Sequence, residues 1–435
     1  MTWAAGGPRP RSKEHDDVAG RRLDALDGLR GVGALVVVVY HTLGFSAWFR
    51  QGMYDYRADG ALEWIAAFSP ARVLLDGRPA VMSFFVLSGF VLTRSFWKGR
   101  SGAWFRYYVR RLIRLYPPVL ASAVLAVGLL ALRQAIDGTG RGVVDLGAAG
   151  TSVSKLATNV GLLGLIDAPL NVVWWSLRWE MWFSVLLPVI LMALVVIGCG
   201  PHRRFRATPA IFGLACVILV GLQPWIRLTY ETSFSTTRAI LYLPMFGVGV
   251  ALAAFEKPLA DYDWPRPRIG WLLLAMSFAL IAVRGPMGWL TMTDRIDPRL
   301  GSGLTEALPL AGVGLFIVLL VSWPVTTRAM SARPLVWVGE RSYSLYLVHL
   351  PLITLLGAVF AVDGASLWFI AVCVASSLGA MVVFYHSVER PSAELASRLG
   401  RPRPGRHRDD ETSDAARARD GASGRSGDRE PVGIG

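Results

Sequence analysis

His41 is the residue of this 435-residue chain whose surroundings most favour acid or base chemistry. It ends the apolar stretch 27–41, in which Arg30 precedes it by eleven residues. Eleven helical residues make three turns plus roughly 20° and rise about 16 Å, so Arg30 and His41 would share one face of a helix. If that helix enters a membrane near Arg30, His41 lies near the bilayer midplane, where an ionisable group is costly and indicates function. The alternative is that His41 only hydrogen-bonds a neighbouring helix.

A carboxylate and a second histidine stand in two other apolar stretches. Glu180 lies within 174–183, which holds four tryptophans, among them Trp175. Tryptophans at a helix start are typical of a membrane interface, but an interface does not explain a carboxylate among them. Glu180 could orient a histidine, bind a polar substrate or pair with an arginine. Tyr346 and His349 are three residues apart and would share a helix face, where they could line a substrate site or contact another helix.

The segment 106–118 is the densest cationic stretch beside an apolar segment. In a helix, Arg110 and Arg114 lie one turn apart with Arg111 beside them. Guanidinium groups bind phosphate through paired hydrogen bonds, which would make this a phosphate site. The alternative is a basic anchor that attracts anionic lipid. Ser88 and the glycine after it lie in another apolar stretch, where small residues either let a second helix approach or leave space for a ligand.

The elements that would hold these residues are membrane helices. Hydrophobic residues make up 53% of the chain and charged residues 17%, with 16 tryptophans, unlike an average soluble protein. Apolar segments of about twenty residues can cross a bilayer. We therefore predict an all-α polytopic membrane protein with about ten transmembrane helices. The predicted segments are 31–49, 79–96, 117–135, 173–199, 207–226, 239–255, 269–283, 304–323, 342–360 and 366–387.

Basic residues indicate how these helices are oriented. The loops on the side of the N-terminus hold 21 Lys and Arg, against 11 in the opposite loops. The positive-inside rule therefore predicts a multi-pass cell-membrane protein with both termini in the cytoplasm. The net charge of +14 follows from this bias and from a basic tail, and it indicates no nucleic-acid partner. We predict a cytoplasmic segment 1–22 without a cleaved signal peptide, followed by a membrane domain 23–391. The last helix of this domain is expected to end at Pro391, and residues 392–435 are expected to form a disordered cytoplasmic tail.

Six motifs in the same order make the chain resemble the acyltransferase 3 family of bacterial membrane O-acyltransferases. They are Asp-Gly-Leu-Arg with ten residues and then His, Phe-Phe-Val-Leu-Ser-Gly-Phe, Arg-Arg-x-x-Arg-x-x-Pro, Trp-Ser-Leu-x-x-Glu, Ser-Tyr-Ser-Leu-Tyr-Leu-Val-His and Glu-Arg-Pro. The similarity runs from about Leu23 to Pro391, and six motifs in register are a strong signal where one would be weak. The chain departs from the pattern at Ser392, where an aromatic residue is common. We also expect no esterase-like domain after the last helix, which argues against a two-step relay to peptidoglycan.

The resemblance implies transfer of an acyl group, usually acetyl, from cytoplasmic acyl-CoA to a hydroxyl. Acceptors in the family are sugars of surface polysaccharides, peptidoglycan or lipids, and macrolide antibiotics. By position, His41 is similar to the family's essential histidine and Arg30 to its paired basic residue. Arg111 and Arg114 match the arginines before the family's proline, and Glu180 matches its carboxylate.

Elementary chemistry fits this reaction. A hydroxyl is a poor nucleophile, whereas a thioester has a good leaving group, so the group that acyl transfer still requires is a base. Neutral imidazole, with an unperturbed pKa of about 6.5, is suited to that role. We expect His41 to be the base and Glu180 to support it. Three arginines and Ser88 would bind acyl-CoA, the arginines through its phosphates: Arg30, Arg111 and Arg114. The residues expected to contact the acceptor are Trp175, Tyr346 and His349.

A membrane transporter of a sugar, polyol or proton is the alternative function. His41, Glu180 and His349 would then form a relay through the bilayer. The sequence shows no inverted repeat and no matched pair of broken helices, which such transporters often have. The three cysteines stand in or at the end of apolar segments and predict neither a disulfide nor a metal site. We expect no metal cofactor.

Overall fold

The computed structural model describes residues 13–97, 104–136, 138, 152–154, 157, 161, 171–196, 207–229, 234–264, 266–360, 364 and 366–399. These residues form helices joined by turns and short loops, and no strand occurs among them. In chain order the helices are α1 (Lys13–Leu43), α2 (Ala47–Tyr54), α3 (Ala61–Phe68), α4 (Arg72–Leu75), α5 (Gly77–Trp97), α6 (Trp104–Ile136), α8 (Trp174–Val196), α9 (Ala207–Thr229), α10 (Phe234–Ala254), α11 (Glu256–Ala260), α12 (Pro267–Ala282), α13 (Arg284–Met292), α14 (Pro298–Ser322), α15 (Pro324–Met330), α16 (Arg333–Glu340), α17 (Ser342–Val359), α18 (Leu367–Phe384), the π-helix η1 (Tyr385–Glu389) and α19 (Arg390–Leu399).

Nine helices of this described part are long and apolar enough to cross a membrane, and the bent pair of α1 and α2 would make a tenth span. Each of these spans overlaps one of the segments predicted from the sequence. Helices satisfy all their backbone hydrogen bonds internally, as a bilayer requires. The protein is therefore an all-α polytopic membrane protein, and this prediction is confirmed.

The first span differs from its predicted bounds, 31–49. Its apolar part in α1 is Gly20–Leu43, after which the chain turns by 117° into α2. Arg30 therefore lies inside α1 rather than at its beginning, and His41 lies in the last turn rather than halfway along a straight helix. The helix ends where Gly44, a weak helix former, follows Leu43.

The last span also differs, because α19 continues to Leu399 where the sequence predicted a helix end at Pro391. One turn of π-helix, Tyr385–Glu389, precedes this proline. A proline ring clashes with the carbonyl four residues earlier in an α-helix, and the wider π turn accommodates it. The predicted tail therefore does not begin at Ser392, and its remainder, 400–435, lies outside the described residues.

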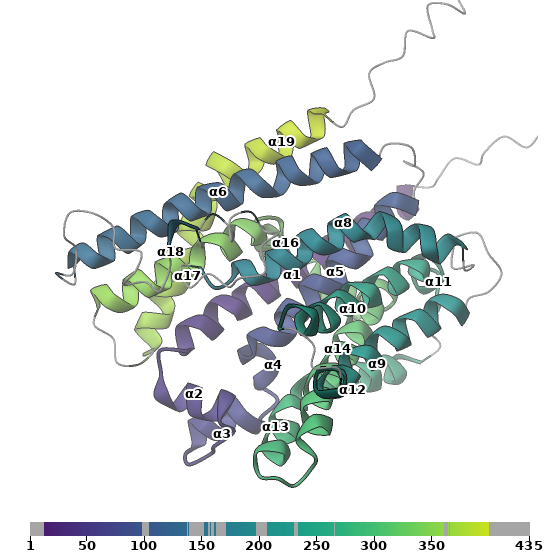
Figure 1. Ribbon diagram of the computed structural model, residues 1–435. Helices are drawn as coiled ribbons and strands as arrows, with labels where there is room; N and C mark the ends of the chain where they lie inside the picture. The colour runs from purple at the N-terminus through teal and green to yellow at the C-terminus, as the bar shows by residue number, and fades with distance from the viewer. Residues whose placement is uncertain are drawn as a thin grey trace, which may run out of the picture.

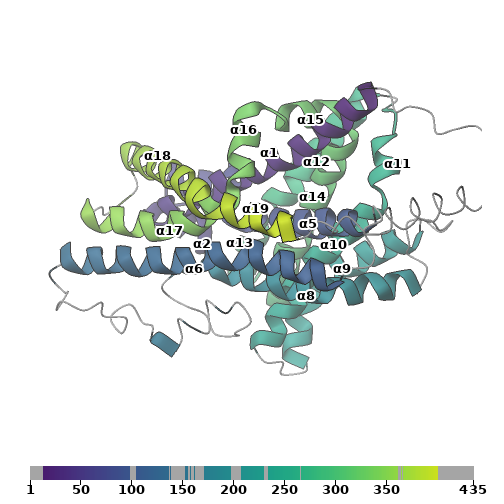
Figure 2. The same ribbon diagram turned by 90° about the horizontal axis from the view of Figure 1, so that it is seen from above.

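The spans pack against one another over contacts that join distant parts of the chain. Figure 1 shows α6 and α19 side by side at one end of the molecule, with α2, α3 and α13 together at the other. Figure 2 shows α6 running beside α17 and α19. α1 packs on α5, α16 and α17, so the helix that carries His41 contacts elements from the middle and the end of the sequence.

Small residues set a close crossing, which joins α5 to α10. A Cβ atom added to Gly89 would lie 2.1 Å from the carbonyl oxygen of Phe246, and one added to Gly249 would lie 2.0 Å from that of Val86. Only glycine lets the two backbones approach this closely. The glycine that follows Ser88 therefore serves packing, whereas Ser88 itself faces a different helix.

Candidate active site

A cavity of about 620 Å³ lies where the end of α1, the beginnings of α5, α8 and α10 and the middle of α17 meet. Its volume falls in the range of about 300–1,000 Å³ that is usual for small-molecule sites. Three predicted site residues line it: His41, Trp175 and Tyr346. Polar residues that the sequence analysis did not assign to a site also line it: Arg78, Asn171, Arg178, Arg238 and Tyr242.

His41 and His349 are neighbours in the structure. Their ring centroids are 5.4 Å apart, with an angle of 40° between the ring planes. His349 is fully buried, and its Nδ1 lies 3.0 Å from the carbonyl oxygen of Leu345. A carbonyl only accepts hydrogen bonds, so we assign the proton of His349 to Nδ1. Its Nε2 then carries a lone pair, and this atom has no hydrogen-bond partner in the described part of the chain.

Tyr346 fixes the middle of α17 against the beginning of α8. Its hydroxyl lies 2.7 Å from the hydroxyl of Ser176 and donates to the carbonyl of Val173 at 3.1 Å. Its ring is 5.8 Å from that of His349. Because Tyr346 and His349 lie three residues apart on one helix face, the bonds that hold the tyrosine also hold the histidine in place.

Trp175 lines the cavity in a cluster of aromatic rings. Its ring centroid is 4.9 Å from that of Tyr242 and 6.0 Å from that of Phe85. The guanidinium of Arg78 lies 5.0 Å from the Tyr242 ring and 5.8 Å from the Trp175 ring. Aromatic faces and a cation attract one another, so these contacts give the cavity a rigid wall.

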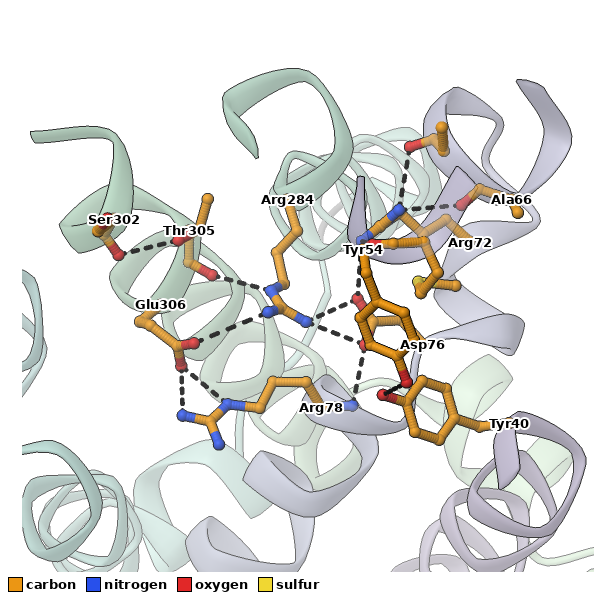
Figure 3. Close-up of polar contacts among 12 residues, drawn as sticks. Tyr40, Tyr54, Ala66, Arg72, Asp76, Arg78, Arg284, Ser302, Thr305 and Glu306 are labelled. Carbon is orange, nitrogen blue, oxygen red and sulfur yellow. Dashed lines mark hydrogen bonds and ion pairs between the residues drawn. The ribbon is translucent and has the colours of Figure 1, made fainter. Parts of the chain in front are cut away.

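Arg78 is held by a network of ion pairs that runs away from the cavity. Figure 3 shows Arg284 between Asp76 and Glu306, with Arg78 beside them. Arg78 donates to Glu306 from Nε at 3.0 Å and Nη2 at 2.9 Å, and from Nη1 to the hydroxyl of Tyr242 at 3.1 Å. Arg284 donates to the two carboxylate oxygens of Asp76 at 2.9 and 2.7 Å. The network therefore joins the beginning of α5 to α13 and α14.

Asp76 is almost completely buried and also pairs with Arg72 at 3.4 Å. Burial by itself would raise the pKa of the Asp76 carboxyl, but Arg284 and Arg72, with the backbone N–H of Arg78, hold this pKa below its usual range. Arg72 in turn donates to the carbonyls of Ala66 and Ala67 at the end of α3. A cation at a helix C-terminus is favourable, so α3 is tied into the same network.

The predicted phosphate-binding arginines lie together in a second cluster. Arg111 forms an ion pair with Glu180 and donates from Nε to the hydroxyl of Ser184 at 3.0 Å. Arg114 interacts electrostatically with Arg111, Arg30 and Glu180. Arg30 itself also pairs with Asp27 at 2.9 Å. The structure thus brings the three arginines into one cluster, and Glu180 belongs to it.

Glu180 and Ser88 lie with the arginine cluster rather than beside His41. The hydroxyl of Ser88 donates to the Glu180 carboxylate at 3.4 Å. Within the described residues Glu180 makes no hydrogen bond to His41, whereas the ring of His349 lies 5.4 Å from that of His41. The pairing of Glu180 with an arginine on another helix was one of three roles that the sequence left open.

A second carboxylate, that of the buried Glu389, completes the arginine cluster. It belongs to the Glu-Arg-Pro motif, but the sequence analysis gave it no role. Its carboxylate accepts from the backbone N–H of Ser344 at 3.0 Å and from the hydroxyl of the same residue, and it interacts electrostatically with Arg114. The signals for it in the sequence were this motif and a charge at the end of an apolar helix.

The two clusters lie on the same helices but are separate. α1 carries Arg30 of the arginine cluster and His41 of the histidine pair. α17 carries Ser344, which contacts the arginine cluster through Glu389, and His349 of the histidine pair. The lining of the cavity includes residues of the histidine cluster and none of the arginines 30, 111 and 114. At about 1.5 Å per residue, eleven residues of α1 separate the clusters by about 16 Å.

No group of three or more His, Cys, Asp or Glu that could hold a metal ion occurs among the described residues. Cys216 and Cys373 are free and buried. Cys199 lies outside the described residues.

Comparison with known proteins gives matches over most of the chain. Residues 23–386 match the family model described as "Acyltransferase domain". The chain is similar to the peptidoglycan O-acetyltransferase OatA of Listeria monocytogenes serovar 1/2a, with 26% identity over 390 residues that cover 84% of this chain and 55% of the relative. It is also similar to the O-acetyltransferase OatA of Staphylococcus aureus strain NCTC 8325, with 26% identity over 361 residues that cover 78% of this chain and 52% of the relative. The chain thus spans about half the length of the curated relatives it matches, and no solved structure matches it.

Proposed function

The chain belongs to the acyltransferase 3 family, and from this premise we propose that it transfers an acetyl group from acetyl-CoA to a hydroxyl of a carbohydrate, with His41 as general base. The observation that carries the proposal is the position of His41, which lines a cavity, contacts a second histidine and shares a helix with one of three clustered arginines. The names of the relatives support acetyl as the acyl group.

In the proposed reaction His41 accepts the proton of the acceptor hydroxyl. The hydroxyl oxygen forms a bond to the thioester carbonyl carbon, and the tetrahedral intermediate then breaks its carbon–sulfur bond. The CoA thiolate leaves and takes up the proton from the His41 imidazolium. General-base assistance of this kind typically contributes a factor of about 10²–10⁴ in rate.

His349 is the proposed positioning residue for the base. Its Nδ1 is occupied by the Leu345 carbonyl, so its Nε2 lone pair can accept a hydrogen bond from one ring nitrogen of His41. The other nitrogen of His41 would then be unprotonated and available to the acceptor. This places on His349 the supporting role that the sequence analysis considered for Glu180.

The arginine cluster is the proposed site for the donor. Arg30, Arg111 and Arg114 would bind the CoA phosphates through charge-assisted hydrogen bonds. Glu180 pairs with Arg111 and would compete with a CoA phosphate for this guanidinium, which would lower the affinity for acetyl-CoA. Ser88 donates to Glu180 and so lies beside the same site. The separation of about 16 Å along α1 is comparable with an extended pantetheine arm, which would carry the thioester from the cluster to His41.

The orientation that supports this scheme has both termini in the cytoplasm. The arginine cluster then faces the side on which acyl-CoA occurs, and the cavity faces the opposite half of the membrane. Trp175 and Tyr242 would pack on a sugar ring, as aromatic faces commonly do in binding sites. Peptidoglycan stands in the name of the Listeria relative, and we propose a cell-envelope carbohydrate as the acceptor class here.

The proposal is tested by incubating purified full-length protein in lipid nanodiscs with acetyl-labelled acetyl-CoA and isolated cell-envelope glycans. We expect label to appear in the glycan as an ester that mild alkali removes. Uptake of free sugar into proteoliposomes without any labelled product would contradict the proposal and favour the transporter alternative.

A further inference from the structure

Two buried polar groups in the wall of the cavity are unpaired among the described residues. Asn171, which precedes α8, is 1% exposed, and its Nδ2 donates to the carbonyl of Leu347 at 3.2 Å while its Oδ1 has no partner. Trp174, the first residue of α8, is 2% exposed, and its indole N–H has no partner either. Both residues line the cavity. Buried polar atoms are normally hydrogen-bonded, so an acceptor and a donor at a cavity wall indicate a polar ligand.

The combination of an acceptor with a donor distinguishes this wall from other parts of α8. Trp179 and Trp182 also have an indole N–H without a partner in the described part of the chain, but neither residue lines the cavity. Asn171 and Trp174 lie within one turn, because the backbone N–H of Trp174 donates to the carbonyl of Asn171 at 3.2 Å. The arginines that line the same cavity already interact within the protein. The unpaired groups therefore suit a neutral group of a ligand.

The beginning of α8 is fixed against the turn of α17 that carries His349. The hydroxyl of Tyr346 donates to the carbonyl of Val173 at 3.1 Å, and Asn171 donates to the carbonyl of the residue after Tyr346. The ring of His349 in turn lies 5.4 Å from that of His41. The two unpaired groups and the proposed base therefore belong to one cavity, and the same turn of α17 contacts both.

We propose that Asn171 and Trp174 bind a neutral group of the acceptor, a hydroxyl or an acetamido group, beside the hydroxyl that is acetylated. Asn171 Oδ1 accepts a hydrogen bond from this group, and the indole N–H of Trp174 donates one to its oxygen. A hydroxyl has one donor and two lone pairs, and an acetamido group has an N–H and a carbonyl, so either can satisfy both side chains. The inference rests on the proposed function, because it names residues that give that reaction its acceptor specificity.

Such a pair selects an acceptor through the cost of being left unpaired. An acceptor that has hydrogen in place of the bound group would bury the Asn171 oxygen and the Trp174 N–H without partners. A site built to hydrogen-bond a substrate group rejects an analogue without that group far more strongly than an apolar pocket rejects a change in size. One polar group of the acceptor, other than the acetylated hydroxyl, should therefore be required for tight binding.

The test measures binding in the absence of donor. Full-length protein in nanodiscs is titrated by calorimetry with methyl β-D-glucoside, its four monodeoxy derivatives and methyl N-acetyl-β-D-glucosaminide. If a hydroxyl is bound, we expect loss of one hydroxyl to weaken binding about tenfold or more. If an acetamido group is bound, the N-acetyl glycoside should instead bind about tenfold or more tightly than the glucoside. The two patterns distinguish the two groups.

Two variants connect this preference to the cavity wall. Trp174→Phe removes the indole N–H and keeps an aromatic ring, and Asn171→Leu removes the amide at a similar size. Each is expected to reduce the preference about threefold or more, because a hydrogen bond that the variant no longer makes cannot be lost again. Asn171→Leu also removes the bond to Leu347, so Trp174→Phe keeps the test valid if that variant does not fold. Trp182→Phe is the matched control, since it makes the same change in the same helix away from the cavity.

Equal affinities for all the probes, no saturable binding of any of them, or a preference that Trp174→Phe leaves unchanged would overturn the inference. An equal reduction by Trp182→Phe would overturn it too. Failure of the proposed function is measured separately, as the absence of labelled ester in the glycan. Label transfer by a protein whose variants show no change in preference would leave the proposed function standing and contradict only the roles of Asn171 and Trp174.

Discussion

At the scale of single residues, His41 is the side chain on which the proposed chemistry depends. We expect His41→Ala to lower kcat by roughly 10²–10⁴, the usual contribution of a general base. The protein is expected to stay folded, because His41 is only half-buried and lines the cavity. The measurement is acetyl transfer by purified variant and wild-type protein at saturating donor.

His386→Ala is the matched control, since His386 is exposed on the π-helix at the end of α18. His349→Gln is expected to lower kcat less than His41→Ala and to change the pH profile of kcat/KM, because its role is to select the protonated nitrogen of the base. Turnover by His41→Ala at the wild-type rate would remove the base assignment.

Arg111 and Glu180 give a second prediction at this scale. Arg111→Gln is expected to raise the KM for acetyl-CoA about tenfold or more, because a charge-assisted contact to phosphate contributes about 1.5–3 kcal/mol. Glu180→Gln is expected to lower this KM, because the guanidinium of Arg111 is then free of its carboxylate partner. Initial rates at varied donor concentration check both.

The matched control is Arg110→Gln, which replaces the neighbouring arginine of α6. An unchanged donor KM in Arg111→Gln would return the cluster to the role of a lipid anchor. A fall in kcat for Glu180→Gln as large as that for His41→Ala would show that the carboxylate supports the base after all.

At the scale of helices, most of the spans were predictable because hydropathy is a local property of the chain. Twenty apolar residues identify a span whatever they pack against. The predicted helix bounds are wrong where hydropathy does not determine the position at which a helix ends. The chain bends by 117° after α1, within the predicted first span, and α19 passes Pro391 because a π turn makes room for the proline ring.

The partners of the site residues were less predictable than the helices. The motif spacing located His41 and the arginines, but it could not tell that His349 rather than Glu180 lies beside His41. Asp76, Arg284 and Glu306 carried no signal as a network, because they are far apart in sequence, and Asp76 and Arg284 lie next to helix ends where charges are common. Partner choice depends on packing in three dimensions, which no single segment encodes.

The crossing of α5 and α10 gives the prediction that belongs to elements. Gly89→Ala is expected to destabilise the protein by about 1–3 kcal/mol, the usual cost of overpacking, because the new Cβ would meet the Phe246 carbonyl. Thermal unfolding in nanodiscs measures the effect. Gly128→Ala in α6 is the matched control, since nothing lies within 4 Å of a Cβ there. Equal unfolding temperatures for the two variants would mean that the helices separate at little cost.

At the scale of the whole molecule, one buried ionic network joins the elements around the cavity. Arg72 reaches carbonyls of α2 and α3, Arg284 belongs to α13, Glu306 to α14 and Arg78 to α5. Asp76 lies at its centre, with both carboxylate oxygens bonded. The network holds Arg78 at the cavity wall, so the geometry of the site depends on contacts outside it.

Asp76→Asn tests this dependence. Asn keeps the size of Asp76 but leaves two buried guanidinium groups without their shared counter-charge, and removal of one partner from a buried ion pair costs about 3–5 kcal/mol. Asp59→Asn is the matched control, because Asp59 and Arg57 are 65% and 64% exposed and a surface pair contributes about 0–1 kcal/mol.

Because the pKa of Asp76 is depressed in the folded protein, the network's contribution to stability is present above the unfolded pKa of about 3.9 and is lost as pH falls through the folded pKa. We therefore expect Asp76→Asn to lower the thermal unfolding temperature at pH 7 far more than Asp59→Asn does. Near-equal effects at pH 7 would mean that the helix packing, and not the network, holds the cavity in shape.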